Sequence, residues 1–91
     1  MGNLTEGMDT ARVREIAGQL TTQAGRIGEV QGNGTSQQGV LAENWLGSDS
    51  EQFGEAWQGA AKALQGAQDA LSAYAKAAIQ QADQQDAASG Q

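Results

Sequence analysis

The chain contains no cysteine and no histidine, and these two absences limit the chemistry that it can perform. Without cysteine there is no disulfide to stabilise the fold and no thiolate to act as a nucleophile or metal ligand. Without histidine the commonest general base and metal ligand are missing, so the usual nucleophile and base pairs cannot be assembled. We therefore expect a protein that is not an enzyme, with no catalytic residue, no cofactor and no metal site.

Basic residues are scarce, and long apolar runs are missing. Eleven acids against five bases give a formal charge of −6, which would repel the phosphates of a nucleic acid. No stretch is long and apolar enough to span a bilayer, and residues 1–7 lack the basic start and apolar run of a secretory signal. We expect neither a nucleic-acid partner nor stable membrane insertion, and any export would need a route that recognises a folded or C-terminal feature.

Proline is also absent, while alanine, glutamine and glutamate are abundant, which favours helix over strand. The pattern predicts an all-α helical hairpin over residues 8–83, with helices at about 9–43 and 49–83 joined by a turn at 44–48. Residues 1–7 are expected to be flexible. Residues 84–91 have almost no apolar side chain to anchor them and are expected to form a disordered tail.

The first predicted helix carries one apolar stripe, because its larger apolar residues fall on the a and d positions of a heptad in which Val13 is a. Asp9 is the expected N-cap. The residues of this predicted seam are Val13, Ile16, Leu20, Ile27, Val30 and Leu41.

The second predicted helix repeats the pattern with alternating steps of four and three residues. Ser48 and Glu51 have the spacing of a capping box at its start. The residues on this stripe are Phe53, Trp57, Ala60, Leu64, Ala67, Leu71, Tyr74 and Ala78, of which Phe53, Trp57, Leu64 and Leu71 are the main predicted seam residues.

The segment between the helices predicts how they are arranged. Gly47 can adopt the left-handed conformation that reverses the chain after a helix end, and the short connection permits only an antiparallel hairpin. Such a hairpin has little interior of its own, so we expect two hairpins to dimerise into a four-helix bundle.

A second line on the first helix consists of small residues at every seventh position: Ala11, Gly18, Gly25, Gly32 and Gly39. Because glycine disfavours a helix interior, one hypothesis is that a partner helix packs closely along this line. The alternative is that these positions face solvent and the glycines are tolerated.

Trp45, Leu46 and Gly47 form a Trp-x-Gly turn at mid-chain, between two amphipathic helices of similar length in a chain without cysteine. With these features the chain resembles the Trp-x-Gly (WXG) family of type VII, or ESX, secretion substrates, over roughly residues 8–83. The resemblance implies a homodimer or heterodimer with another Trp-x-Gly protein, recognition by the type VII secretion ATPase, and export from a Gram-positive or actinobacterial cell, in some cases with a larger effector. The alternative for Trp45 is a hydrophobic plug of the turn.

The chain departs from this family at Tyr74. Family members carry an acid four residues after a tyrosine near the end of the second helix, and together with the partner's Trp-x-Gly turn this forms the export signal. Here Ala78 stands in that place, and the next acid is Asp83. The chain would then be exported with a partner that carries the complete motif, or use a variant signal, or stay inside the cell; Tyr74 also fits simple packing in the seam.

The function implied is that of a small secreted or co-secreted substrate that serves as an export partner, with Trp45, Gly47 and Tyr74 as its motif residues. One alternative is a cytoplasmic coiled-coil adaptor. A membrane-active hairpin is the other, and it is disfavoured by the small number of basic residues.

Overall fold

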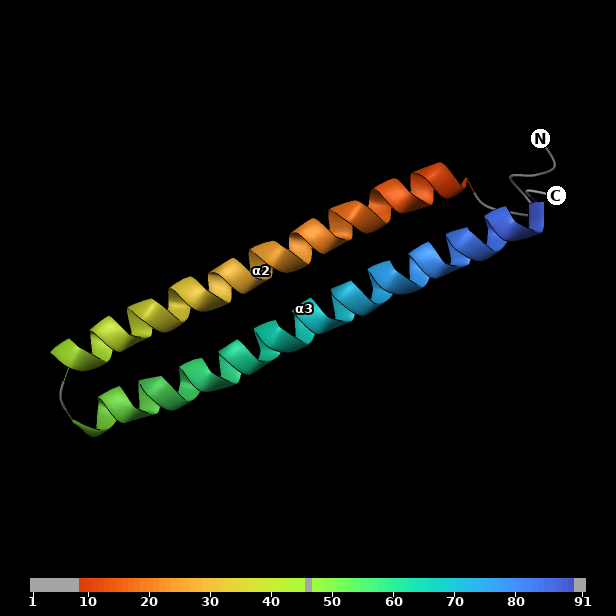
Figure 1. Cartoon of the computed structure of the whole chain (residues 1–91). Coiled ribbons are helices and arrows are strands. Elements are labelled where there is room, and N and C mark those ends of the chain that lie inside the picture. The colour runs from red at the N-terminus through yellow and green to blue at the C-terminus, as the bar shows by residue number, and fades with distance from the viewer. Residues whose placement is uncertain (1–8, 46, 90–91) are drawn as a thin grey trace. The chain divides into compact units, whose positions relative to one another are not determined.

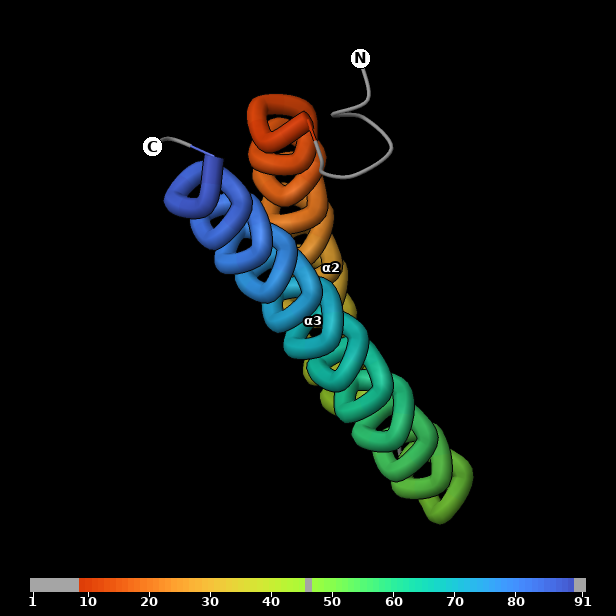
Figure 2. Tube along the Cα trace, turned by 90° about the vertical axis from the view of Figure 1, so that its right-hand side faces the viewer, coloured from red at the N-terminus to blue at the C-terminus, as the bar shows by residue number. Residues whose placement is uncertain are grey.

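The computed structural model describes residues 9–45 and 47–89, and these form two helices, α2 (Thr10–Asn44) and α3 (Ser48–Ser89) (Figure 1). The two helices form an antiparallel hairpin, and no strand occurs in the described residues, so the predicted all-α fold is confirmed. The chain divides into two compact units. The terminal unit comprises the residues up to Gln23 and from Ala70 onward, and the turn unit comprises Ala24–Asp69. In each unit one segment of α2 runs beside one segment of α3 (Figures 1 and 2).

Helix α2 begins where the sequence predicts. The Asp9 carboxylate accepts a hydrogen bond from the Arg12 backbone N–H at 3.1 Å, as an N-cap does, and the Asp9 carbonyl accepts the N–H of Val13 at 3.0 Å. The predicted flexible segment 1–7 lies outside the described residues.

The turn between the helices depends on a glycine. Gly47 has a φ of +118°, a conformation that residues with a Cβ rarely adopt, which confirms the prediction from its position after the helix end. Its carbonyl accepts the N–H of Ser50 at 3.2 Å, and α3 begins at Ser48. Leu46, the middle residue of the Trp-x-Gly motif, lies outside the described residues.

Helix α3 extends further than the sequence predicts. It continues to Ser89, so the predicted end at residue 83 is wrong, as is the predicted disorder for residues 84–89. In this stretch Arg14 on α2 pairs with Asp83 and Asp86 on α3, a contact between distant residues that composition alone does not reveal. The last two residues of the predicted tail lie outside the described part.

The faces that the two helices present to each other are rotated from the predicted seam. On α2 the less exposed positions include Val13, Ala17, Leu20, Ala24, Ile27, Gln31, Gly34 and Gln38, which are a and e positions of the heptad. On α3 they include Gly54, Trp57, Ala61, Leu64, Gln68, Leu71, Ala75, Ala78 and Ala82. Six predicted seam residues are thus in the hairpin contact: Val13, Leu20, Ile27, Trp57, Leu64 and Leu71.

The other four predicted seam residues are exposed: Ile16, Val30, Leu41 and Phe53. Tyr74 is exposed as well, so the contact between α2 and α3 does not cover it. The physical reason is that the apolar arc of each helix is wider than one helix contact, and α2 and α3 meet along the lines with the smaller side chains. The exposed line of larger side chains borders that contact.

Neither α2 nor α3 contains a segment apolar enough, over sufficient length, to cross a bilayer.

Candidate functional site

The contact between α2 and α3 buries very little. Among the described residues only four apolar side chains are buried: Ala17, Ala24, Ala75 and Ala82. No described side chain of larger size is fully enclosed. Burial of apolar surface stabilises the folded state by roughly 25 cal/mol per Å². Because an alanine side chain buries little surface, the four alanines stabilise the hairpin much less than a core of leucine or phenylalanine would. Each unit therefore has a close helix contact with a weak hydrophobic core.

In the turn unit the bulkiest contact is made by an indole against a glycine. Trp57 on α3 lies against Gly34 on α2 so closely that a Cβ at position 34 would overlap the indole ring. The indole Nε1–H donates a hydrogen bond to the Thr35 hydroxyl at 3.0 Å. Gly34 is the a position that the predicted seam left empty, and the ring of Trp57 occupies the space of the missing side chain.

A pair of amides lies in the same contact. The Gln68 side-chain amide donates a hydrogen bond to the Gln31 side-chain oxygen at 2.6 Å, and both residues are half-buried. The Gln68 side chain also passes over Gly28, where an added Cβ would lie 2.8 Å from its oxygen. A polar pair in an otherwise apolar contact favours one alignment of the helices, because any shift leaves both amides without a partner.

The large apolar side chains that the hairpin leaves outside are the candidates for contact with another protein. Exposed fractions are 40% for Ile16, 57% for Val30, 59% for Phe53 and 69% for Tyr74. Ile16 and Val30 follow the d line of α2, next to the e line that contains buried Ala17 and Ala24. On α3, Tyr74 stands beside buried Ala75.

A groove of about 450 Å³ lies in the terminal unit between the two helices, and we call it the terminal groove. Its walls are almost entirely apolar. They are formed by Val13, Ile16, Ala17, Leu20, Tyr74, Ala77, Ala78 and Gln81. Ile16 and Tyr74, both exposed, come from opposite helices, so an apolar side chain of a partner can be enclosed between them.

The turn unit contains a smaller groove of about 240 Å³ next to the Trp-x-Gly turn, which we call the turn groove. It is lined by Gly34, Gln37, Gln38, Leu41, Ala42, Trp45, Ser50, Phe53 and Trp57. The rings of Trp45 and Phe53 meet at 4.8 Å between centroids, tilted by 51°, a favourable arrangement for aromatic side chains. Trp45 thus packs back onto the start of α3, and Gly47 permits the chain reversal that places it there.

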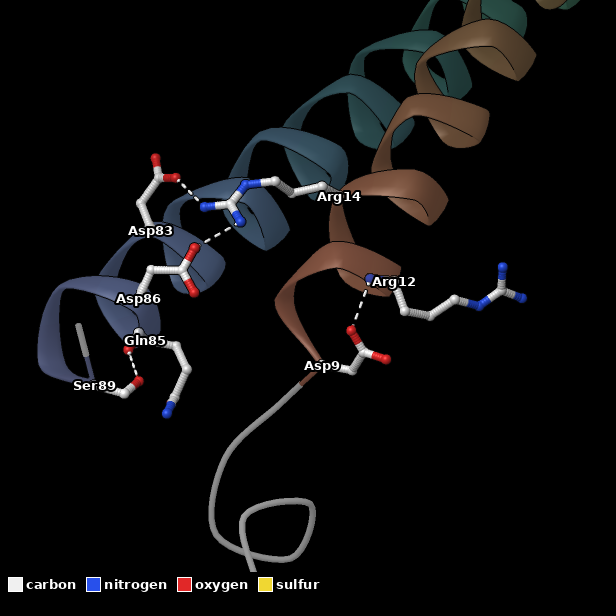
Figure 3. A network of polar contacts seen from close by, with 7 residues as sticks. All are labelled: Asp9, Arg12, Arg14, Asp83, Gln85, Asp86 and Ser89. Carbon is white, nitrogen blue, oxygen red and sulfur yellow. Dashed lines mark hydrogen bonds and ion pairs between the residues drawn. The ribbon is translucent and has the colours of Figure 1, made fainter. Parts of the chain in front are cut away.

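The charged group that joins the helices in the terminal unit is Arg14 (Figure 3). Its two terminal nitrogens contact Asp83 and Asp86, each at 2.7 Å. Hydrogen bonds from Thr10 and then from Arg14 lower the pKa of Asp86, and the bonds to Asp83 and Asp86 raise the pKa of Arg14. All three side chains are substantially exposed to solvent, and exposed ion pairs contribute little to the free energy of folding. The cluster therefore links the end of α3 to α2 but adds little stability.

The motif residues predicted from the sequence fall in different units. Trp45 and Gly47 belong to the turn unit and Tyr74 to the terminal unit, where it lines the terminal groove. Sequence reasoning missed Gly34, Gln31, Gln68 and Arg14. The empty a position at Gly34, three heptads after Val13, was a usable signal for a bulky residue on the opposite helix.

No protein-family model, no curated protein and no solved structure matches the chain.

Proposed function

We propose that the chain is a small secreted or co-secreted substrate of a type VII secretion system, which pairs with another helical hairpin and serves as its export partner. The observation that carries the proposal is the pattern of burial. The hairpin contact encloses only alanines, while large side chains such as Ile16, Phe53 and Tyr74 stay exposed beside it. A chain of this length gains stability when such side chains are covered by a second hairpin.

The turn supports the export part of the proposal. Trp45 is held next to Phe53 in a groove that is open to solvent, so its indole is available to a partner as well as to the turn. Tyr74, the other motif residue, is 69% exposed and also lines a groove. The export signal would then be completed by the partner, because Ala78 stands where family members have an acid.

Sedimentation tests the pairing. The chain alone, or mixed with a second Trp-x-Gly protein encoded beside it, should form a dimer at micromolar concentration. Ile16→Gln combined with Tyr74→Gln should dissociate it, because both residues border the terminal groove. Ile79→Gln is the matched control, since Ile79 is 38% exposed but lines neither the terminal groove nor the turn groove. A stable, fully helical monomer under all of these conditions would contradict the pairing.

Export is tested by following tagged protein in the culture medium, with and without the secretion ATPase and the partner. Trp45→Ala should reduce export more than it lowers the melting temperature, because Trp45 contacts one turn at the end of the hairpin. Trp57→Ala is the comparison, since it removes the contact with Gly34 and Thr35 and should lower the melting temperature strongly. If Trp45→Ala reduces export only in proportion to stability, Trp45 is a structural plug.

A second candidate function is a cytoplasmic coiled-coil adaptor. The residue that favours it is Ala78, which leaves Tyr74 without the acid of the export signal. Under this function the hairpin pairs through the same exposed side chains and never reaches the medium. The secretion measurement distinguishes the two: retention of the protein in cells with an active secretion system and the partner present supports the adaptor.

A further inference from the structure

The charges of the chain are unevenly distributed between its two units. Between Arg26 and Lys62 there are five acids, Glu29, Glu43, Asp49, Glu51 and Glu55, and no lysine or arginine. The turn unit as a whole has six acids and two bases, Arg26 and Lys62, whereas the terminal unit has five acids and three bases, Arg12, Arg14 and Lys76. The helix ends that meet at the turn therefore carry charge of one sign.

Two of these acids are close in sequence to residues that line grooves of the turn unit. Glu43 comes three residues after Val40, which with Leu41 and Trp45 lines a second groove on the α2 side of the turn. Asp49 comes four residues before Phe53, so the two lie on the same face of α3. Val40, Leu41 and Phe53 are all about half exposed or more, at 59%, 48% and 59%. Along the chain, two carboxylate residues thus adjoin residues that line these grooves.

The end of α2 adds to this negative field. The last turn of a helix carries partial negative charge on its free carbonyl groups, and a lysine or arginine commonly balances it. The last turn of α2 contains no basic residue, and Glu43 adds a full negative charge. The Asn44 side chain donates a hydrogen bond to the Val40 carbonyl at 2.8 Å, which supplies no positive charge to the helix end.

We propose that the turn groove, together with the adjoining surface at Val40, is a docking site for a basic segment of another protein that inserts an apolar side chain against Leu41 and Phe53. Lysine or arginine beside that anchor would meet Glu43, Asp49 and the carbonyl end of α2. A second copy of this chain is disfavoured at the same place, because it would bring five further acids against the first five. An anionic lipid surface is disfavoured for the same reason.

The inference rests on the proposed function, since it names the chemistry of the partner for one of the two units. It predicts a partner that is richer in bases than this chain where it contacts the turn. The terminal groove, whose walls carry no charged side chain, is free to pair by apolar contact alone.

The probe is a short amphipathic peptide of leucine and lysine without aromatic residues, compared with the same peptide in which every lysine is replaced by glutamate. Binding to the full chain is followed by NMR through the indole N–H signals of Trp45 and Trp57. The lysine peptide should shift the Trp45 signal and bind about tenfold or more tightly than the glutamate peptide. Added salt should lower the affinity of the lysine peptide.

Two pairs of variants separate the groove from the general charge of the protein. Glu43→Gln with Asp49→Asn should weaken binding of the lysine peptide by about fivefold, because Glu43 follows Ala42 and Asp49 precedes Ser50, two residues that line the turn groove. Glu29→Gln with Asp69→Asn removes the same number of charges from the turn unit, away from the groove, and should have a smaller effect. Leu41→Ala should weaken binding as well, whereas Val30→Ala should not.

The inference would be overturned by equal affinity for the lysine and glutamate peptides, by equal loss in the two charge-removing pairs, or by an unshifted Trp45 signal. A dimer of the chain alone that Phe53→Gln dissociates would overturn it too, since a second copy would then cover the groove. If hairpins pair but the lysine peptide does not bind, only this inference fails. If the peptide binds but neither pairing nor export is found, the proposed function fails instead.

Discussion

The indole of Trp57 occupies the place of a side chain that Gly34 lacks. A Cβ on Gly34 would overlap the six-membered ring of the indole, while the Nε1–H of its five-membered ring donates a hydrogen bond to the hydroxyl of the adjacent Thr35. Trp57, the bulkiest residue of α3 in the hairpin contact, therefore fits against α2 at Gly34. This pair fixes the alignment of the two helices in the turn unit.

Gly34→Ala should destabilise the hairpin although alanine is the better helix former. The new methyl group forces the indole away, which loses its packing and its bond to Thr35, at a cost of about 1–3 kcal/mol. Thermal and denaturant unfolding followed by circular dichroism measures this. Gly32→Ala is the control, because nothing lies within 4 Å of a Cβ there, and it should raise stability by up to about 1 kcal/mol. Equal gains in both variants would show that Trp57 does not lie against Gly34 in solution.

The amide pair of Gln31 and Gln68 should show coupling in a double-mutant cycle. Gln31→Leu alone leaves the Gln68 amide without its partner and should cost about 1 kcal/mol. Adding Gln68→Leu should recover much of that loss, because two apolar side chains then meet. The four unfolding free energies give the coupling directly. Additive effects of the two substitutions would mean that the hydrogen bond contributes nothing to the native hairpin.

The end of α3 should loosen in acid. The native pKa of Asp86 lies below its unfolded value, so its contribution to stability is present above the unfolded pKa and is lost as the pH falls through the native pKa. Amide exchange of residues 84–89 should therefore accelerate below about pH 4. Arg14→Gln should give faster exchange already at neutral pH and a weaker dependence on pH, since Thr10 remains as a donor. Unchanged protection in acid would show that Arg14 and Asp86 do not hold the helix end.

Position 25 distinguishes the two hypotheses for the line of small residues on α2. A Cβ at Gly25 would meet nothing within 4 Å, so Gly25→Ala should raise the stability of the hairpin by up to about 1 kcal/mol. If a partner helix packs on this line, Gly25→Leu should weaken the dimer by roughly 1–3 kcal/mol. Sedimentation of the leucine variant against the unchanged chain measures it. Unchanged affinity would mean that this line faces solvent and that the hairpins pair through the terminal groove of Ile16 and Tyr74.

Much of the secondary structure follows from the sequence. The positions of both helices, the Asp9 cap and the reversal at Gly47 depend on residues within a few positions of one another, so local propensity and spacing are enough to predict them. The end of α3 was not predicted, and part of its surroundings is supplied by Arg14, which pairs with Asp86 from about seventy residues away in the sequence.

The faces of the helices were decided only by the tertiary structure. Heptad spacing defines an apolar arc on each helix, and two neighbouring lines one residue apart, such as Ile16 and Ala17 or Tyr74 and Ala75, satisfy it about equally well. The hairpin chooses Ala17 and Ala75 because small side chains let the helices approach closely, with the indole of Trp57 fitted over Gly34 and the amides of Gln31 and Gln68 paired. Close packing requires the side-chain volumes of both helices to be complementary. The heptad pattern of each helix, considered separately, does not reveal which lines are complementary.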